Sequence, residues 1–346
     1  MTATPESGVL VAEGLSKSYG SSTVLRDLTF TLPRGHVMGF LGPNGAGKTT
    51  SIRILTTIMQ PTSGRFEIDG QDFRHPAKIR PLIGVLPETL GLPNQISGME
   101  YLSYFAQLYG WKRAAARRRA GELLELVGLR TRGSRLIRTY SHGMRQRLGI
   151  ARALVNDPVV LFLDEPVLGL DPRGQQDLLA LLRDIAANQG ASIILSSHAL
   201  SDAEGVCDDV VILTDGRVVA SGPLSEVLAN ARHDGARKAA VRLRVPGPYM
   251  DPAAATLRTL QTVSDVSTIV DGDLRVTIEG SVDTLPTDEV ANELLVRLIR
   301  EGIPVFGFEI EGSRLSDVFL ELTEGAAPLA PRRQGRAAGR HDRHGG

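Results

Sequence analysis

Residues 42–49, GPNGAGKT, match the spacing G-x-x-x-x-G-K-[ST] of a phosphate-binding loop. The loop follows the apolar run Val37–Leu41 and precedes a helical pattern. Because glycine has no Cβ atom, such a backbone can fold around a phosphate and point successive N–H groups at it. A helix that begins near Gly47 adds the positive end of its dipole. We therefore predict a nucleotide site here, in preference to a glycine-rich turn that binds nothing.

Two side chains of this loop supply further chemistry. Lys48 is expected to reach the β and γ phosphates and to act in catalysis, and the Thr49 hydroxyl is expected to bind Mg²⁺. The predicted ATP contacts in this stretch are Gly42, Pro43, Asn44, Gly45, Ala46, Gly47, Lys48, Thr49 and Thr50.

A pair of carboxylates ends a second apolar run. Asp164 and Glu165 directly follow Val159–Leu163 in VVLFLDEP. Hard cations prefer oxygen ligands, so we assign Asp164 to the metal and Glu165 to the attacking water as general base. The alternative is a pair of acids that caps a helix. Beside the loop at Gly42 the first interpretation is favoured, and it predicts hydrolysis of Mg-ATP.

Composition limits the class of protein. The 346 residues suggest two domains, and a formal net charge of zero gives no global field to attract nucleic acid or an anionic membrane. The single cysteine, Cys207, excludes an intrachain disulfide and fits a reducing cytosol. We find no leader and no apolar run near the ~18 residues that span a bilayer. Any role at a membrane is therefore expected to come through a partner.

Residues 8 to about 224 alternate between short apolar strands and helical patterns, which predicts an α/β fold with a mostly parallel sheet. The alternating stretch LTFTLP near the N-terminus predicts an added antiparallel layer. Two alternating runs around Asp215 and Gly216 predict a hairpin. A long helical region is expected between Leu86 and Val159, where the run KRAAARRRA is interpreted as a solvated helix face in preference to a nucleic-acid site.

A second, smaller domain is expected after a linker. The predicted boundaries are 1–224, linker 225–239, small α/β domain 240–323 and a disordered basic tail 324–346. The order β-α-β-β-α-β over 240–310 predicts a split βαβ sandwich of the ferredoxin-like type. The stretch RLSDVFLELT then places Leu315, Val318, Phe319 and Leu322 on one helical stripe, so we expect it to dock.

The segment YSHGMRQRLGIARAL resembles the signature segment of ATP-binding cassette (ABC) ATPases, whose core is S-G-G-Q. Ser141 and Gly143 match, whereas His142 replaces the first glycine and Met144 the glutamine. Ser141 is a good helix cap, and the N–H groups beyond it form a second anion site. One chain needs a second such site only if it meets another subunit's γ-phosphate, which predicts a head-to-tail homodimer.

Further motifs follow in the order of this family. GLDP, residues 169–172, resembles the D-loop and implies that Asp171 contacts the shared nucleotide site. His198 in LSSHAL resembles the switch histidine at the γ-phosphate, and Tyr19 in LSKSYG resembles the aromatic that stacks on adenine. A buried core tyrosine is the alternative for Tyr19. The resemblance covers about residues 8–224 and implies a P-loop ABC ATPase core with a helical subdomain.

One residue departs from the family pattern at the metal. Where the family has glutamine, this chain has Glu88, which is expected to bind Mg²⁺ but also to repel the phosphates by about 1 kcal/mol or more. We therefore expect the activity to depend more strongly on Mg²⁺ occupancy or on pH.

The closing RLSDVFLELT and the region around GMEYLSYFAQLYG resemble ATP-binding subunits of ABC-2-type exporters, including drug-resistance and sodium-efflux systems. This resemblance implies a homodimer, peripheral on the cytoplasmic face of the cell membrane, docked on separate integral membrane subunits, with no nucleic acid bound. There are two alternatives: an importer ATPase, and an ABC ATPase that acts on the ribosome or on DNA. The transported substrate leaves no mark on this sequence.

Overall fold

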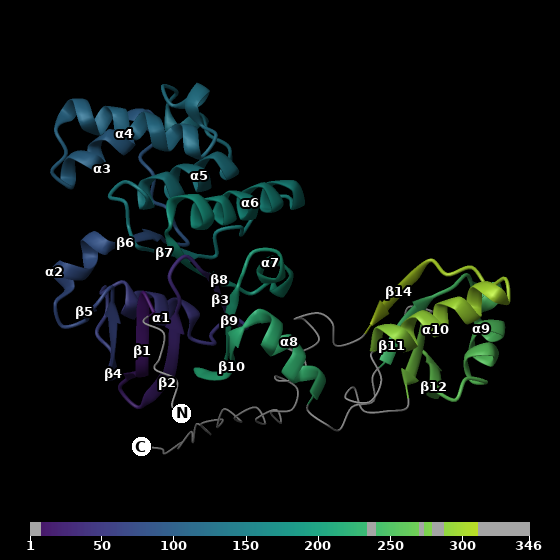
Figure 1. Ribbon diagram of the computed structural model, residues 1–346. Coiled ribbons are helices and arrows are strands. Elements are labelled where there is room, and N and C mark those ends of the chain that lie inside the picture. Colours follow the sequence, from purple (N-terminus) through teal and green to yellow (C-terminus); the bar gives the residue numbers. More distant parts are fainter. Residues whose placement is uncertain (1–7, 234–239, 270–272, 279–286, 311–346) are drawn as a thin grey trace, which may run out of the picture.

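The computed structural model describes residues 8–233, 240–269, 273–278 and 287–310 (Figure 1). The described residues form two units with separate hydrophobic cores, residues 8–233 and residues 240–310. Among the described helices, none is both long and apolar enough to cross a membrane.

The first unit is built on a six-stranded sheet in the order β10-β9-β3-β8-β7-β6. Its strands are parallel except at the β9–β10 hairpin, where Asp215 and Gly216 both adopt positive φ, as the sequence predicted. Val37 and Leu41 of β3 face one core, while Met38 and Phe40 face the other, which explains the continuous apolar run. The strands are β3 Val37–Leu41, β6 Ile83–Leu86, β7 Val160–Asp164, β8 Ser192–Ser197, β9 Asp209–Thr214 and β10 Arg217–Pro223.

An antiparallel sheet in the order β2-β1-β4-β5 forms the predicted second layer. Helix α1 (Lys48–Leu55) shares a core with both sheets, in which Phe30 meets Phe40 edge to face at 5.1 Å between ring centroids. The strands are β1 Leu10–Tyr19, β2 Ser22–Leu32, β4 Ser63–Ile68 and β5 Gln71–Asp72.

The predicted helical region lies between β6 and β7. Ser97 and Glu100 form a capping box that fixes the start of α3. The arginines Arg117 and Arg118 of the basic run are exposed on α4, as expected for a solvated face. The helices of this unit are α2 Pro76–Ile79, α3 Gly98–Leu108, α4 Arg113–Leu126, α5 His142–Ala153, α6 Pro172–Gln189, α7 Leu200–Glu204 and α8 Leu224–His233. Helix α8 therefore occupies most of 225–239, the stretch that the sequence assigned to a linker.

The second unit is an antiparallel sheet in the order β12-β13-β11-β14, with α9 and α10 in the connections. This strand order is that of the predicted ferredoxin-like sandwich. Its elements are β11 Ala240–Arg244, α9 Met250–Leu257, β12 Val263–Thr268, β13 Leu274–Ile278, α10 Thr287–Arg300 and β14 Gly307–Ile310. The stretch RLSDVFLELT and the basic tail, 324–346, lie outside the described residues, so both interpretations stay predictions.

Candidate active site

The phosphate loop leaves the carboxyl end of β3 and enters α1. A Cβ atom on Gly42 would lie 2.3 Å from the carbonyl oxygen of Leu213, so only glycine fits there. Gly47 precedes α1 with φ 106°, and no side chain caps the first turn of the helix. The uncapped N–H groups and the glycine backbone fit a bound phosphate.

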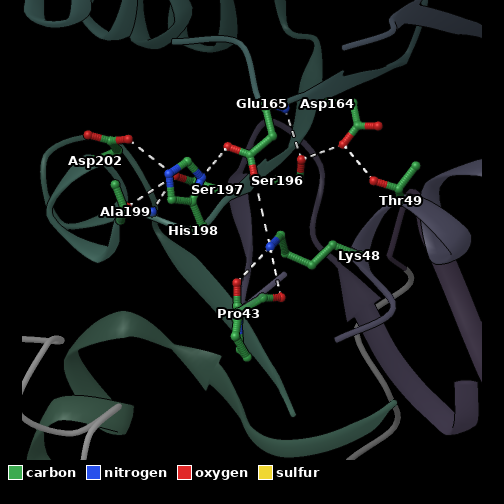
Figure 2. Close-up of polar contacts among 11 residues, drawn as sticks. Pro43, Lys48, Thr49, Asp164, Glu165, Ser196, Ser197, His198, Ala199 and Asp202 are labelled. Atoms are coloured by element: carbon green, nitrogen blue, oxygen red, sulfur yellow. Dashed lines mark hydrogen bonds and ion pairs between the residues drawn. The ribbon is translucent and has the colours of Figure 1, made fainter. Parts of the chain in front are cut away.

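Lys48 is buried beneath this loop. Its Nζ donates to the carbonyl oxygens of Gly42, at 2.6 Å, and Pro43, at 3.3 Å, and lies 3.7 Å from Oε1 of Glu165 (Figure 2). Burial lowers the pKa of Lys48, and the negative charges of Glu165 and Asp164 oppose this shift. The ammonium group thus lies between the loop and the carboxylates, where a γ-phosphate would meet it.

Asp164 and Thr49 present oxygen atoms to each other at the end of β7. The Thr49 hydroxyl donates to Oδ1 of Asp164 at 3.3 Å, and Asp164 is buried. A carboxylate and a hydroxyl are hard oxygen donors, which fits Mg²⁺. No group of three or more His, Cys, Asp or Glu side chains with metal-binding geometry occurs in the described part of the chain. Phosphate oxygens and water would therefore complete the coordination, as Mg²⁺ commonly requires.

Glu165 holds an uncommon backbone conformation next to this pair. Its φ of 49° is left-handed, a strained conformation for a residue other than glycine. The imidazole Nδ1 of His198 lies 2.9 Å from Oε2 of Glu165. The carboxylate is therefore placed between Lys48 and His198, which suits a base that must be oriented toward one water molecule.

Ser196 joins the two carboxylate residues, and sequence reasoning missed it. Its hydroxyl donates to Oδ1 of Asp164 at 2.7 Å and accepts from the backbone N–H of Glu165 at 2.9 Å (Figure 2). Ser196 is fully buried and pairs in register with Asp164 across parallel strands β8 and β7. The available signal was a polar pair, Ser196 and Ser197, at the end of an otherwise apolar strand.

The turn that carries His198 is held by the next serine. The Ser197 hydroxyl donates to Oδ2 of Asp202 at 3.1 Å and accepts from the backbone N–H of Ala199 at 3.0 Å. Burial raises the pKa of Asp202, opposed by its bond from Ser197 and by the charge of His198. These bonds fix the direction in which the imidazole leaves β8.

Lys48, Glu165 and His198 line a cavity of about 350 Å³, which we call the phosphate-loop cavity; Asp164 and Gly42 lie behind its wall and do not line it. Glu88, exposed on the loop after β6, lies in its wall, and its role as a Mg²⁺ ligand stays a prediction. Its lining residues are Val24, Pro43, Asn44, Gly45, Ala46, Gly47, Lys48, Thr49, Thr50, Glu88, Glu165, Leu168 and His198. Val24 was not singled out by the sequence.

Tyr19 lies at the end of β1 and is 48% exposed, so the buried-core alternative is wrong. Its hydroxyl donates to Sδ of Met59 at 2.9 Å, and Nζ of Lys17 lies 5.4 Å from its ring centroid. The ring is not among the residues that line the phosphate-loop cavity. Stacking on adenine therefore stays a prediction.

Ser141, Gly143 and Asp171 line a second cavity of about 390 Å³, which we call the serine-helix cavity. The Ser141 hydroxyl accepts from the N–H of Met144 and caps α5, while Asp171 caps α6. The two cavities share no lining residue. Within one chain, these three predicted ATP contacts are therefore not brought to Lys48.

Comparisons with known proteins agree with this geometry. Residues 25–168 match the family described as ABC transporter. The chain is 35% identical over 315 residues to the daunorubicin resistance ATP-binding protein DrrA3 of Streptomyces coeruleorubidus, covering 91% of this chain and 95% of that protein. It is 30% identical over 316 residues to the linearmycin resistance ATP-binding protein LnrL of Bacillus subtilis, covering 91% of this chain and 98% of that protein.

A solved structure of an ATP-binding subunit of an ABC transporter superposes with a TM-score of 0.58 at 36% identity. The superposition covers 64% of this chain and 92% of the solved chain. The match is therefore to a cassette that lacks most of the second unit. Together with a phosphate loop, a carboxylate pair and a serine-capped signature helix, these relatives place the chain in the family of ABC transporter ATP-binding proteins, as an ATPase.

Proposed function

We propose that two copies of this chain bind Mg-ATP head to tail and drive export through separate integral membrane subunits at the cytoplasmic face of the cell membrane. One observation carries the proposal. The lysine and the base line one cavity, the signature serine lines another, and no residue lines both. A second copy, related by a twofold axis, would bring each serine-capped helix to the other chain's phosphate loop.

Residues in the phosphate-loop cavity, together with Asp164 beside it, would divide the work of hydrolysis. Lys48 would neutralise charge on the γ-phosphate, and bound Mg²⁺, on Thr49, Asp164 and Glu88, would supply further neutralisation. Glu165 would take the proton of the attacking water on a carboxylate oxygen. His198 would orient that carboxylate through the 2.9 Å contact. The N–H groups beyond Ser141 of the second copy would contact the same γ-phosphate.

The direction of transport is inferred from the relatives that match almost the whole chain. They confer resistance to daunorubicin and to linearmycin, and resistance of this kind is consistent with removal of the compound from the cell. We therefore assign this ATPase to an exporter and expect no nucleic-acid partner.

The dimer is tested with Glu165→Gln, which keeps the shape of the side chain but cannot take the proton. We expect this variant to bind ATP, to stop turnover and to accumulate as a dimer in size-exclusion chromatography with light scattering. An unchanged rate of ATP hydrolysis would show that Glu165 is not the general base. A protein that stays monomeric with ATP bound would contradict the shared site.

Coupling to a membrane partner is tested separately. The reading frame beside this gene should encode about six apolar spans of roughly 20 residues each. Co-expression with that neighbour should move the chain to the membrane fraction and change its ATPase rate. Sedimentation with ribosomes instead would favour a non-transport ATPase.

A further inference from the structure

A groove of about 560 Å³ lies on the second unit, away from the residues assigned to ATP. Its walls come from the end of α10, the start of β14 and the short turn before α9. The apolar side chains in it are Tyr249, Leu295, Ile299, Ile303, Val305, Phe306 and Phe308. It is therefore an open groove at one edge of the sheet, in which apolar side chains lie beside polar groups.

Several of these side chains are exposed although their backbone is fixed. Phe306 is 73% and Ile299 is 66% exposed. The N–H of Phe306 donates to the carbonyl oxygen of Arg244 at 2.8 Å, so the backbone of Phe306 is fixed beside the sheet. Clustered exposed apolar side chains of this kind mark an interaction surface.

We propose that residues 314–323 of the same chain, RLSDVFLELT, dock in this groove as a helix. Leu315, Val318, Phe319 and Leu322 have the spacing i, i+3, i+4 and i+7 of one apolar face. That face suits the apolar side chains of the groove, and the opposite side carries Asp317. The segment holds two acids against one arginine, while the last turn of α10 carries Arg297 and Arg300.

The path of the chain favours this occupant over others. Strand β14 is an edge strand, and its first residues, Gly307 and Phe308, line the groove. Ile310 ends β14 about 13 Å further along. Residues 311–313 are enough to reverse direction, and a ten-residue helix is about 15 Å long. A helix that runs back along β14 therefore reaches the groove without any further linker.

Cysteine cross-linking in the full-length chain tests the proposal, since Cys207 is the only native cysteine and is buried. In a Cys207→Ala background, Ile299→Cys is combined in turn with Val318→Cys, Phe319→Cys or, as the matched control, Asp317→Cys. Mild oxidation and electrophoresis without reductant then measure the rate of disulfide formation. Intrachain disulfide bonds from positions 318 and 319 should form at least about ten times faster than from position 317. Tethering raises the local concentration of the thiol only where the geometry permits contact.

Three outcomes would overturn the proposal. Equal rates at 317, 318 and 319 would mean that the segment has no preferred face in the groove. Products that join two chains, at a rate that rises with protein concentration, would assign the groove to a second copy. No bond at any position would show that the segment does not dock here.

A second measurement needs no oxidation. Val318→Ser combined with Phe319→Ser should increase the fluorescence of an added hydrophobic dye, because the groove becomes accessible. Asp317→Ser should leave the fluorescence unchanged. An equal response of both variants would contradict the proposed docking.

Discussion

The phosphate-loop cavity and the serine-helix cavity have similar volumes, about 350 and 390 Å³, but different chemistry. In the first, the strained glutamate Glu165 contacts both the buried Lys48 and His198. In the second, the polar groups Ser141 and Asp171 mainly cap helices. On the proposed dimer, the first surface would perform the reaction and the second would complete it with N–H groups.

The largest expected effect comes from separating the two cavities by mutation. Lys48→Ala and Ser141→Arg should each abolish turnover alone. When the two variants are mixed, half of the dimers contain one intact composite site, so about a quarter of the wild-type ATPase rate should return. If each chain carried a whole site, mixing would restore nothing, and the comparison of the two cavities would fail.

The next effect concerns orientation within the phosphate-loop cavity. His198→Ala should lower kcat by roughly 10²-fold, since the base loses its orienting partner, and should leave KM for ATP almost unchanged. Steady-state kinetics measure both values. His75→Ala, at an exposed position, is the control. A rise in KM with constant kcat would make His198 a binding residue only.

A smaller effect is expected at Ser196, which ties Asp164 to the backbone of Glu165. Ser196→Ala should reduce kcat about ten-fold and lower the free energy of unfolding by about 1–3 kcal/mol, because a buried carboxylate loses a donor. Ser192→Ala removes a buried hydroxyl at the other end of β8 and should affect stability alone. Equal losses of kcat in both variants would deny Ser196 a positioning role.

The smallest effect is expected at the cavity wall. Glu88→Gln removes a negative charge near the phosphates, so the ratio of ATP affinities with and without Mg²⁺ should fall about five-fold, equivalent to about 1 kcal/mol. Isothermal titration with Mg²⁺ and with a chelator measures this ratio. Glu122→Gln, which makes the same charge change on α4, is the control and should leave this ratio of affinities unchanged. Identical titration curves for the native chain and Glu88→Gln would contradict the predicted repulsion between Glu88 and the phosphates.

Local patterns were enough to predict most of the elements and much of the site. The apolar run of β3, the glycines of the loop and the acids after β7 are contiguous, so their chemistry is visible without a fold. The Asp215-Gly216 turn is equally local, since both residues must tolerate positive φ. Helix α8, in contrast, lies where the sequence predicts a linker. Only tertiary packing gives its short apolar face a partner, because Val227 and Leu228 pack in the core that also contains Val37.

The sequence by itself determined which groups are present: a phosphate loop, two carboxylates at the end of an apolar strand and a serine-led helix. The tertiary structure alone decided which of them meet. Ser196 reaches Asp164 only because β7 and β8 are parallel neighbours in register, and Ser141 is kept from Lys48 because α5 opens onto another cavity. Contacts between residues distant in sequence depend on strand order and register, which no local spacing encodes.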